Sequence, residues 1–142
     1  MQAEISTVAH VIQLAVAPVF LLTGVGAILS VLTNRLGRIV DRFRVLERTL
    51  LDAENESAHR EEMAALAYRE KVIYWAISLC TVCALLICVV IATLFVGAVT
   101  GVELSGVIAL LFILAMLALI IGLLSFLREI YIATGTMHRA VK

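Results

Sequence analysis

The stretch that decides the fold is VFLLTGVGAILS at residues 19–30, followed directly by VLTNRLGRIVDRFR at residues 31–44. The first part carries no charged side chain, whereas the second carries four arginines and one aspartate. A long uncharged run that ends in a cluster of arginines is typical of a helix leaving a lipid bilayer at its cytoplasmic side. The sequence therefore predicts a membrane-embedded helix that reaches the edge of the bilayer near Asn34.

The rest of the chain has the same apolar character. Of its 142 residues, 63% are hydrophobic, and the mean hydropathy is +1.08. Three runs lack Asp, Glu, Lys and Arg, at residues 5–34, 72–102 and 104–127. Each is longer than the roughly 20 residues that a helix needs to cross a bilayer. Because helices satisfy their own backbone groups in lipid, we expect three transmembrane helices.

The basic residues predict how these helices are oriented. All 11 Lys and Arg residues fall in two places, because eight lie between the first and second runs and three follow the third. Basic residues collect in the cytoplasmic loops of membrane proteins. We therefore expect a multi-pass membrane protein with its N-terminus outside and its C-terminus in the cytoplasm.

The connection between the first two spans is predicted to be helical as well. Apolar residues continue beyond Asn34 at helical spacing, and a polar stretch, DAENES at residues 52–57, is the best candidate for a turn. Helix is expected to resume near Ala58. The apolar positions on the two arms of this hairpin are Leu36, Ile39, Val40, Phe43, Leu46 and Leu50, then Met63, Leu66, Ile73 and Ile77.

These features predict an all-α integral membrane protein that forms one domain over residues 1–142. The spans are expected at about 8–34, 72–100 and 104–127, with a cytoplasmic helical hairpin at about 35–71 that extends the first two helices. The residues 99–106, VTGVELSG, are expected to form an outer turn with Gly101 and Gly106. The third span has no ionisable group before Arg128, so it is expected to be the most exposed to lipid.

The polar content of the membrane region lies on the first helix. A set of residues at alternating spacings of three and four forms one stripe, with polar groups at both ends and small or apolar residues in the middle. We call this set the α1 stripe. Its members are His10, Gln13, Ala17, Phe20, Gly24, Ala27, Val31, Asn34, Arg38 and Asp41.

Two interpretations of the α1 stripe are open. It can be a packing seam, either against the other two helices or against a second copy of the chain, since small residues let helices approach closely. Alternatively, it lines a pore in an oligomer, with Phe20 and Val31 as constrictions and Gln13, Asn34 and Arg38 as polar mouths. A repeat of 3.5 residues drifts by about 20° per heptad on a straight helix, so either interpretation requires supercoiling.

The sequence offers little support for catalysis or for cofactors. No phosphate loop, serine elbow or zinc-protease motif is present, so we expect no enzyme and no catalytic or cofactor-binding residue. Cys80 and Cys83 form a CxxC within a predicted span, without the further ligands that zinc requires, so packing is the expected role. The formal net charge is zero, which gives no basis for nucleic-acid binding.

Residues 12–47 carry a resemblance to a known family. APVFLL at residues 17–22 and LTNRLGRIVDR at residues 32–42 resemble the bacterial membrane proteins grouped as domain of unknown function 2721. The resemblance implies a bacterial cytoplasmic-membrane protein and transfers no catalytic residue, because the family has no established activity.

We therefore expect the lipid bilayer and further copies of the same chain as partners, with the first helix nearest the symmetry axis. Two functions follow as hypotheses. One is a pore for ions or small solutes, based on the α1 stripe. The other is a structural or regulatory membrane protein whose cytoplasmic hairpin docks a partner protein, based on the amphipathic extension from Leu36 to Leu50.

Overall fold

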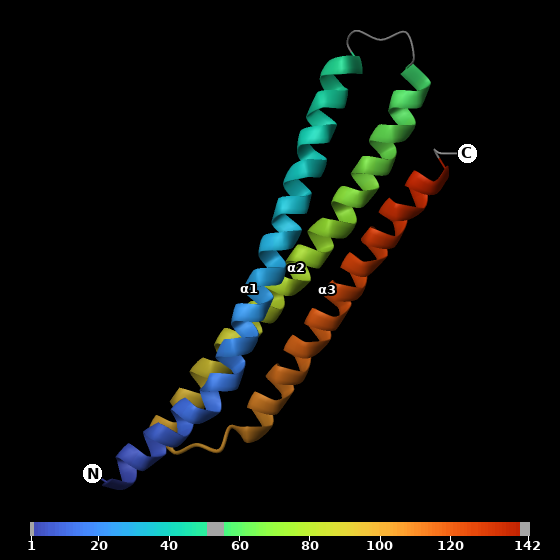
Figure 1. Cartoon of the computed structure of the whole chain (residues 1–142). Helices are drawn as coiled ribbons and strands as arrows, with labels where there is room; N and C mark the ends of the chain where they lie inside the picture. Colours follow the sequence, from blue (N-terminus) through green and yellow to red (C-terminus); the bar gives the residue numbers. More distant parts are fainter. Residues whose placement is uncertain (1, 51–55, 140–142) are drawn as a thin grey trace. The chain divides into compact units, whose positions relative to one another are not determined.

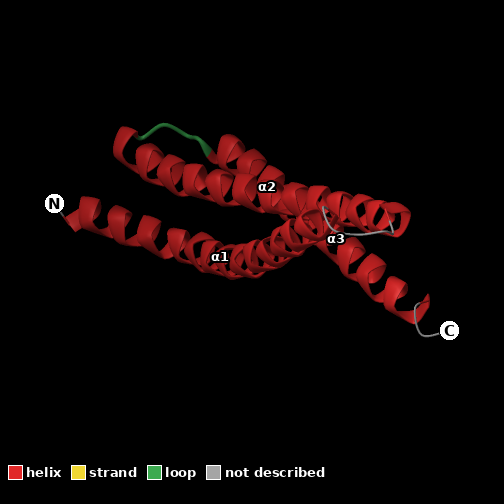
Figure 2. Cartoon of the chain, turned by 90° about the horizontal axis from the view of Figure 1, so that it is seen from above, coloured by secondary structure: helices red, strands yellow, loops and turns green. Residues whose placement is uncertain are grey.

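The computed structural model describes the backbone of residues 2–50 and 56–139, and the side chains of residues 8–48, 63–128, 130 and 131. The described residues form three helices: α1 (Gln2–Leu50), α2 (Glu56–Thr100) and α3 (Ser105–Arg139), coloured from blue to red in Figure 1. All of the regular structure in this part of the chain is helical (Figure 2). The all-α prediction is therefore confirmed.

Each helix is long and apolar enough to cross a membrane, within Val8–Arg48, Met63–Thr100 and Ser105–Arg128. α1 has 49 residues, which is about 73 Å at a rise of 1.5 Å per residue, more than twice the roughly 30 Å of a hydrocarbon core. The prediction that the first helix continues past Asn34 is thus confirmed. Residues 52–55 of the expected DAENES turn lie outside the described residues, and α2 begins at Glu56, two positions before the predicted start at Ala58.

The turn between α2 and α3 is closed by a glycine cap. Gly101 has a φ of +69°, and its N–H donates to the carbonyl of Gly97 at 2.9 Å. This is the αL cap that ends many helices, and it favours glycine because a Cβ is strained at positive φ. The prediction of a turn at Gly101 is confirmed, but Gly106 lies within the first turn of α3 rather than in the connection.

Two units divide the described chain, and each draws on all three helices. Unit 1 comprises residues 1–29 and 79–120. Its buried residues include many small side chains, and small residues at helix contacts let backbones approach closely. The buried hydrophobic residues of unit 1 are Val11, Ala15 and Val25 from α1, Cys80, Cys83, Ile87 and Val90 from α2, and Ala115 and Ala118 from α3.

Unit 2 comprises residues 30–78 and 121–142, and its core joins the charged extensions of α1 and α2. Ile39 and Leu46 of α1 pack with Leu66 and Ile73 of α2 in one buried cluster. Leu36, Phe43, Met63 and Ile77 pack against this cluster. Eight of the ten apolar positions that the sequence predicts for the two arms of the hairpin are in this group, so the common face is confirmed for these eight. Val40 is half-buried but is not part of the cluster, and the side chain of Leu50 lies outside the described residues.

The buried side of α1 follows a regular repeat. Buried and half-buried residues recur at alternating steps of four and three, a mean of 3.5 residues, which is the repeat of a left-handed coiled coil. Pro18 is one of them, and the helix continues through it. The series is Val11, Ala15, Pro18, Leu22, Val25, Leu29, Leu32, Leu36, Ile39, Phe43 and Leu46.

α3 exposes the largest share of its apolar surface. Only 11% of its most apolar window is buried, compared with 17% for α1 and 22% for α2. The expectation that the third helix is the one most open to its surroundings agrees with these values. Its small residues Ala115, Ala118 and Gly122 are buried, and its bulky aliphatic residues lie on the opposite side.

Candidate functional site

The α1 stripe is entirely exposed within the chain. None of its ten members, from His10 to Asp41, is buried or half-buried. Phe20, at 73% exposed, is the most accessible large apolar side chain among them. The sequence left open whether α2 and α3 cover this stripe, and in the structure they do not.

The stripe keeps a constant position relative to the buried side of α1. Both series advance by alternating steps of three and four, and the stripe occupies the heptad positions that point away from the buried seam. In a helix that supercoils with this repeat, the angular drift of a straight helix does not accumulate. The stripe is therefore an outward surface from His10 to Ala27 within unit 1, and an outward surface from Val31 to Asp41 within unit 2.

The side chains in the middle of the stripe are small. A Cβ atom built on Gly24 or on Gly26 would meet no described atom within 4 Å. Ala17 and Ala27 are exposed as well. Small residues on a membrane helix commonly permit close helix–helix contact, but no described part of the same chain makes such a contact at these glycines.

Two threonine hydroxyl groups beside the stripe are satisfied within α1 itself. Thr23 donates to the carbonyl of Val19 at 3.2 Å, and Thr33 donates to that of Ser30 at 3.0 Å. Such bonds to the preceding turn let hydroxyls face an apolar medium at low cost. The longer side chains of Gln13 and Asn34 carry two donors and an acceptor group each, which a single bond of this kind does not satisfy.

The charged end of the stripe begins where α1 and α3 meet. The Cζ atom of Arg35 lies 5.2 Å from the ring centroid of Phe126 on α3, within the range of a cation–π interaction. Sequence reasoning did not find this contact. The available signal was that Arg35 directly follows the first apolar run and Phe126 lies at the end of the third, so both belong at the same boundary.

The remaining candidate groups lie apart from the stripe. Cys80 and Cys83 are buried in unit 1, and Cys88 is exposed; all three are free thiols. Among the side chains that the structure describes, no group of three or more His, Cys, Asp or Glu residues is arranged to hold a metal ion.

The structure has three helices that are each long and apolar enough to cross a membrane, which is the architecture of a multi-pass membrane protein. The chain belongs to the family described as protein of unknown function (DUF2721), which it matches over residues 15–139. No curated protein and no solved structure matches the chain.

Proposed function

We propose that this protein forms a homo-oligomer in the bacterial cytoplasmic membrane, with the α1 stripe nearest the symmetry axis. In this proposal the assembled stripes line a pore for ions or small solutes. The observation that carries it is that all ten stripe residues face outward from their own chain.

Burial in lipid is a poor alternative for this surface. Polar side chains such as Gln13 are costly when they face hydrocarbon and are usually directed toward protein or water. The exposed Gly24 and Ala27 offer no bulk to contact acyl chains but suit the close approach of a second helix. A second copy of α1 supplies both small neighbours and hydrogen-bonding partners at once.

The proposed orientation rests on the basic residues. Eight of the 11 Lys and Arg residues lie between the apolar part of α1 and the apolar part of α2, and three follow the apolar part of α3. The positive-inside bias assigns both places to the cytoplasm. Arg38 and Asp41 then form the inner mouth of the pore, and His10 and Gln13 the outer mouth.

Apolar rings would gate such a pore. Phe20 and Val31 are large apolar members of the stripe and are 73% and 52% exposed in the single chain. Rings of apolar side chains can close a pore by excluding water, while polar rings at the mouths select and admit ions. Phe20 is the larger of the two and is proposed as the narrower constriction.

A flux assay in liposomes tests the pore directly. Replacing Phe20 by Ala (Phe20→Ala) should raise the flux of a permeant ion several-fold, because the apolar constriction is widened. Phe112→Ala is the matched control, since Phe112 on α3 is also exposed but lies outside the stripe. Correctly assembled wild-type protein that passes no common ion, with both variants equally silent, would contradict the pore.

The alternative function, a hairpin that docks a partner protein, has less support. This alternative rests on the apolar side of the extension from Leu36 to Leu50. On that side, Ile39 and Leu46 pack against Leu66 and Ile73 of the same chain. Among the side chains that the structure describes in this extension, residues 36–48, Val45 is the large apolar one that stays exposed. Co-purification of a stoichiometric second protein that is lost in Val45→Asp, with assembly intact, would favour this alternative.

A further inference from the structure

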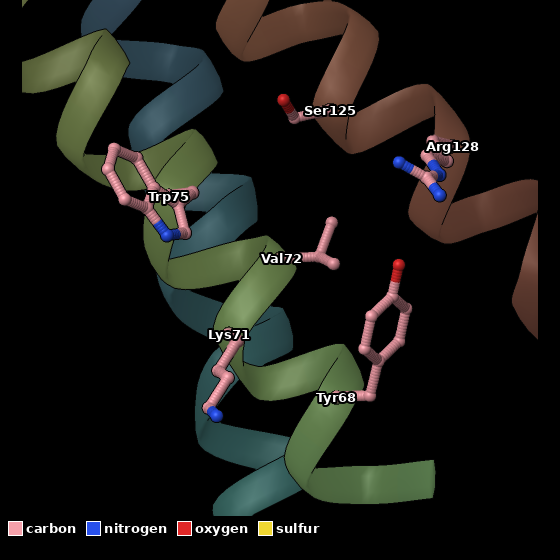
Figure 3. A pocket seen from close by; sticks show the side chains of 6 residues that line it. All are labelled: Tyr68, Lys71, Val72, Trp75, Ser125 and Arg128. Carbon is pink, nitrogen blue, oxygen red and sulfur yellow. The ribbon is translucent and has the colours of Figure 1, made fainter.

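A cavity of about 320 Å³ lies within unit 2, between α2 and α3. α2 contributes Tyr68, Lys71, Val72 and Trp75, and α3 contributes Ser125 and Arg128 (Figure 3). Its volume is at the lower end of the range for small-molecule pockets. Two of its six lining residues are basic and none is acidic, so the cavity suits an anion.

The cavity lies where the apolar runs end. Lys71 is the residue directly before the run 72–102, and Arg128 directly follows the run 104–127. Arg35, which directly follows the run 5–34, contacts Phe126 in the same unit. The cations that directly border the three apolar runs, Arg35, Lys71 and Arg128, thus all lie in unit 2. In a bilayer, the ends of the apolar runs are at the level of the lipid headgroups.

The cavity is lined by both hydrogen-bond donors and apolar side chains. In Figure 3, Tyr68 and Arg128 point toward each other, while the ammonium of Lys71 extends away from α3 on its flexible stem. The hydroxyl of Ser125 donates to the carbonyl of Ile121 at 2.8 Å, so its proton is already used. The guanidinium of Arg128 and the phenol of Tyr68 are therefore the main donors, because a guanidinium matches the oxygens of a phosphate well.

We infer that this cavity binds the phosphate of an anionic phospholipid at the inner boundary of the membrane. Arg128 holds the phosphate, Tyr68 donates a further hydrogen bond, and Lys71 adds positive charge. Val72 and the exposed ring of Trp75 lie beside it toward the apolar runs, where acyl chains would pack. A basic pocket between membrane helices on the cytoplasmic side is a known form of headgroup site. The cavity is formed by one chain, so this inference does not depend on the proposed pore.

Trp75 makes the site measurable, because it is the one tryptophan of the chain. The full-length protein is reconstituted in phosphatidylcholine vesicles with a small, fixed fraction of brominated lipid, which quenches nearby indoles. Brominated phosphatidylglycerol should quench Trp75 more strongly than the same fraction of brominated phosphatidylcholine. Equal quenching by the two lipids in the wild-type protein would overturn the inference.

Single-charge variants separate the cavity from general surface attraction. Arg128→Gln should lower the preference for the anionic lipid about fivefold, the contribution expected of one cation near a membrane surface. Lys71→Gln should have a smaller effect, and Arg128→Lys should keep part of the preference. Arg44→Gln is the matched control, because Arg44 is exposed on α1 and does not line the cavity. An equal loss in Arg44→Gln and Arg128→Gln would overturn the site.

A soluble ligand is distinguished in the same system. Glycerol 3-phosphate, added to vesicles that contain brominated phosphatidylglycerol, should leave the quenching of Trp75 unchanged, because it lacks acyl chains. Relief of quenching at millimolar concentrations would assign the cavity to a soluble phosphate ester and overturn the lipid assignment. Circular dichroism of each variant shows whether the helices are intact.

Discussion

The outward sides of α1 and α3 are both open to their surroundings but differ in chemistry. On α3 the exposed residues are bulky and aliphatic, such as Leu110, Ile113 and Leu117. On α1 the stripe alternates Gln13, small residues such as Ala27, and isolated large residues. Lipid tails can cover the first surface at no cost, whereas the second leaves amides unsatisfied in hydrocarbon. The comparison teaches that composition, and not exposure alone, separates a lipid-facing side from a protein-facing side.

The largest expected effect comes from the side of α1 that faces its own chain. Leu32 is fully buried, while its neighbour Val31 lies in the stripe and is 52% exposed. Leu32→Ala should destabilise the folded chain by about 2–3 kcal/mol, the lower part of the usual range, because lipid is as apolar as leucine. Val31→Ala should change chain stability by less than about 0.5 kcal/mol. Unfolding in mixed micelles with increasing dodecyl sulfate measures both. Equal losses would mean that the two sides of α1 are not distinct.

The next effect separates the outward sides of α1 and α3. Ala27 and Ala109 are both exposed alanines, on α1 and α3 respectively. Ala27→Leu should weaken the oligomer by about 1–3 kcal/mol, because a bulky side chain overpacks a close helix contact. Ala109→Leu should leave the oligomer unchanged, since added bulk there meets only lipid. Sedimentation equilibrium in detergent gives the association constants. A weaker association constant for Ala109→Leu, with none for Ala27→Leu, would indicate that α3 and not α1 contacts the other copy.

The smallest expected effect concerns a single polar group. Gln13→Leu should weaken association by about 0.6 kcal/mol, the average contribution of a hydrogen bond between membrane helices. The same substitution would strengthen membrane insertion if Gln13 faced lipid, because it removes a polar group from hydrocarbon. Leu117→Ile on α3 provides the control for a change of shape without a change of polarity. Stronger membrane insertion of Gln13→Leu with unchanged association would place Gln13 against lipid and contradict the proposed contact.

Much of the fold could be predicted from the sequence, because apolar runs and helical spacing are local properties. The three helices, the extension past Asn34 and the shared apolar side of Ile39, Leu46, Leu66 and Ile73 all follow from such patterns. The start of α2 at Glu56 and the place of Gly106 inside α3 did not, because turns are set by a few residues whose preferences are weak.

The candidate sites divide in the same way. The α1 stripe is a periodic pattern on one helix, so it can be found in the sequence. Whether its residues are exposed depends on where α2 and α3 pack against α1, which no local pattern in the sequence determines. The cavity between Tyr68 and Arg128 brings together residues 60 positions apart. No local pattern marks such a pair, although both lie next to the ends of apolar runs.

The most direct test of the account is disulfide crosslinking between copies in native membranes. In a background with Cys80, Cys83 and Cys88 replaced by alanine, one cysteine is placed on α1 (Ala27→Cys) or on α3 (Ala109→Cys). The account predicts that mild oxidation links Ala27→Cys chains into dimers and leaves Ala109→Cys chains as monomers. Efficient dimers of Ala109→Cys, with none of Ala27→Cys, would contradict the claim that α1 is covered by another copy of the chain.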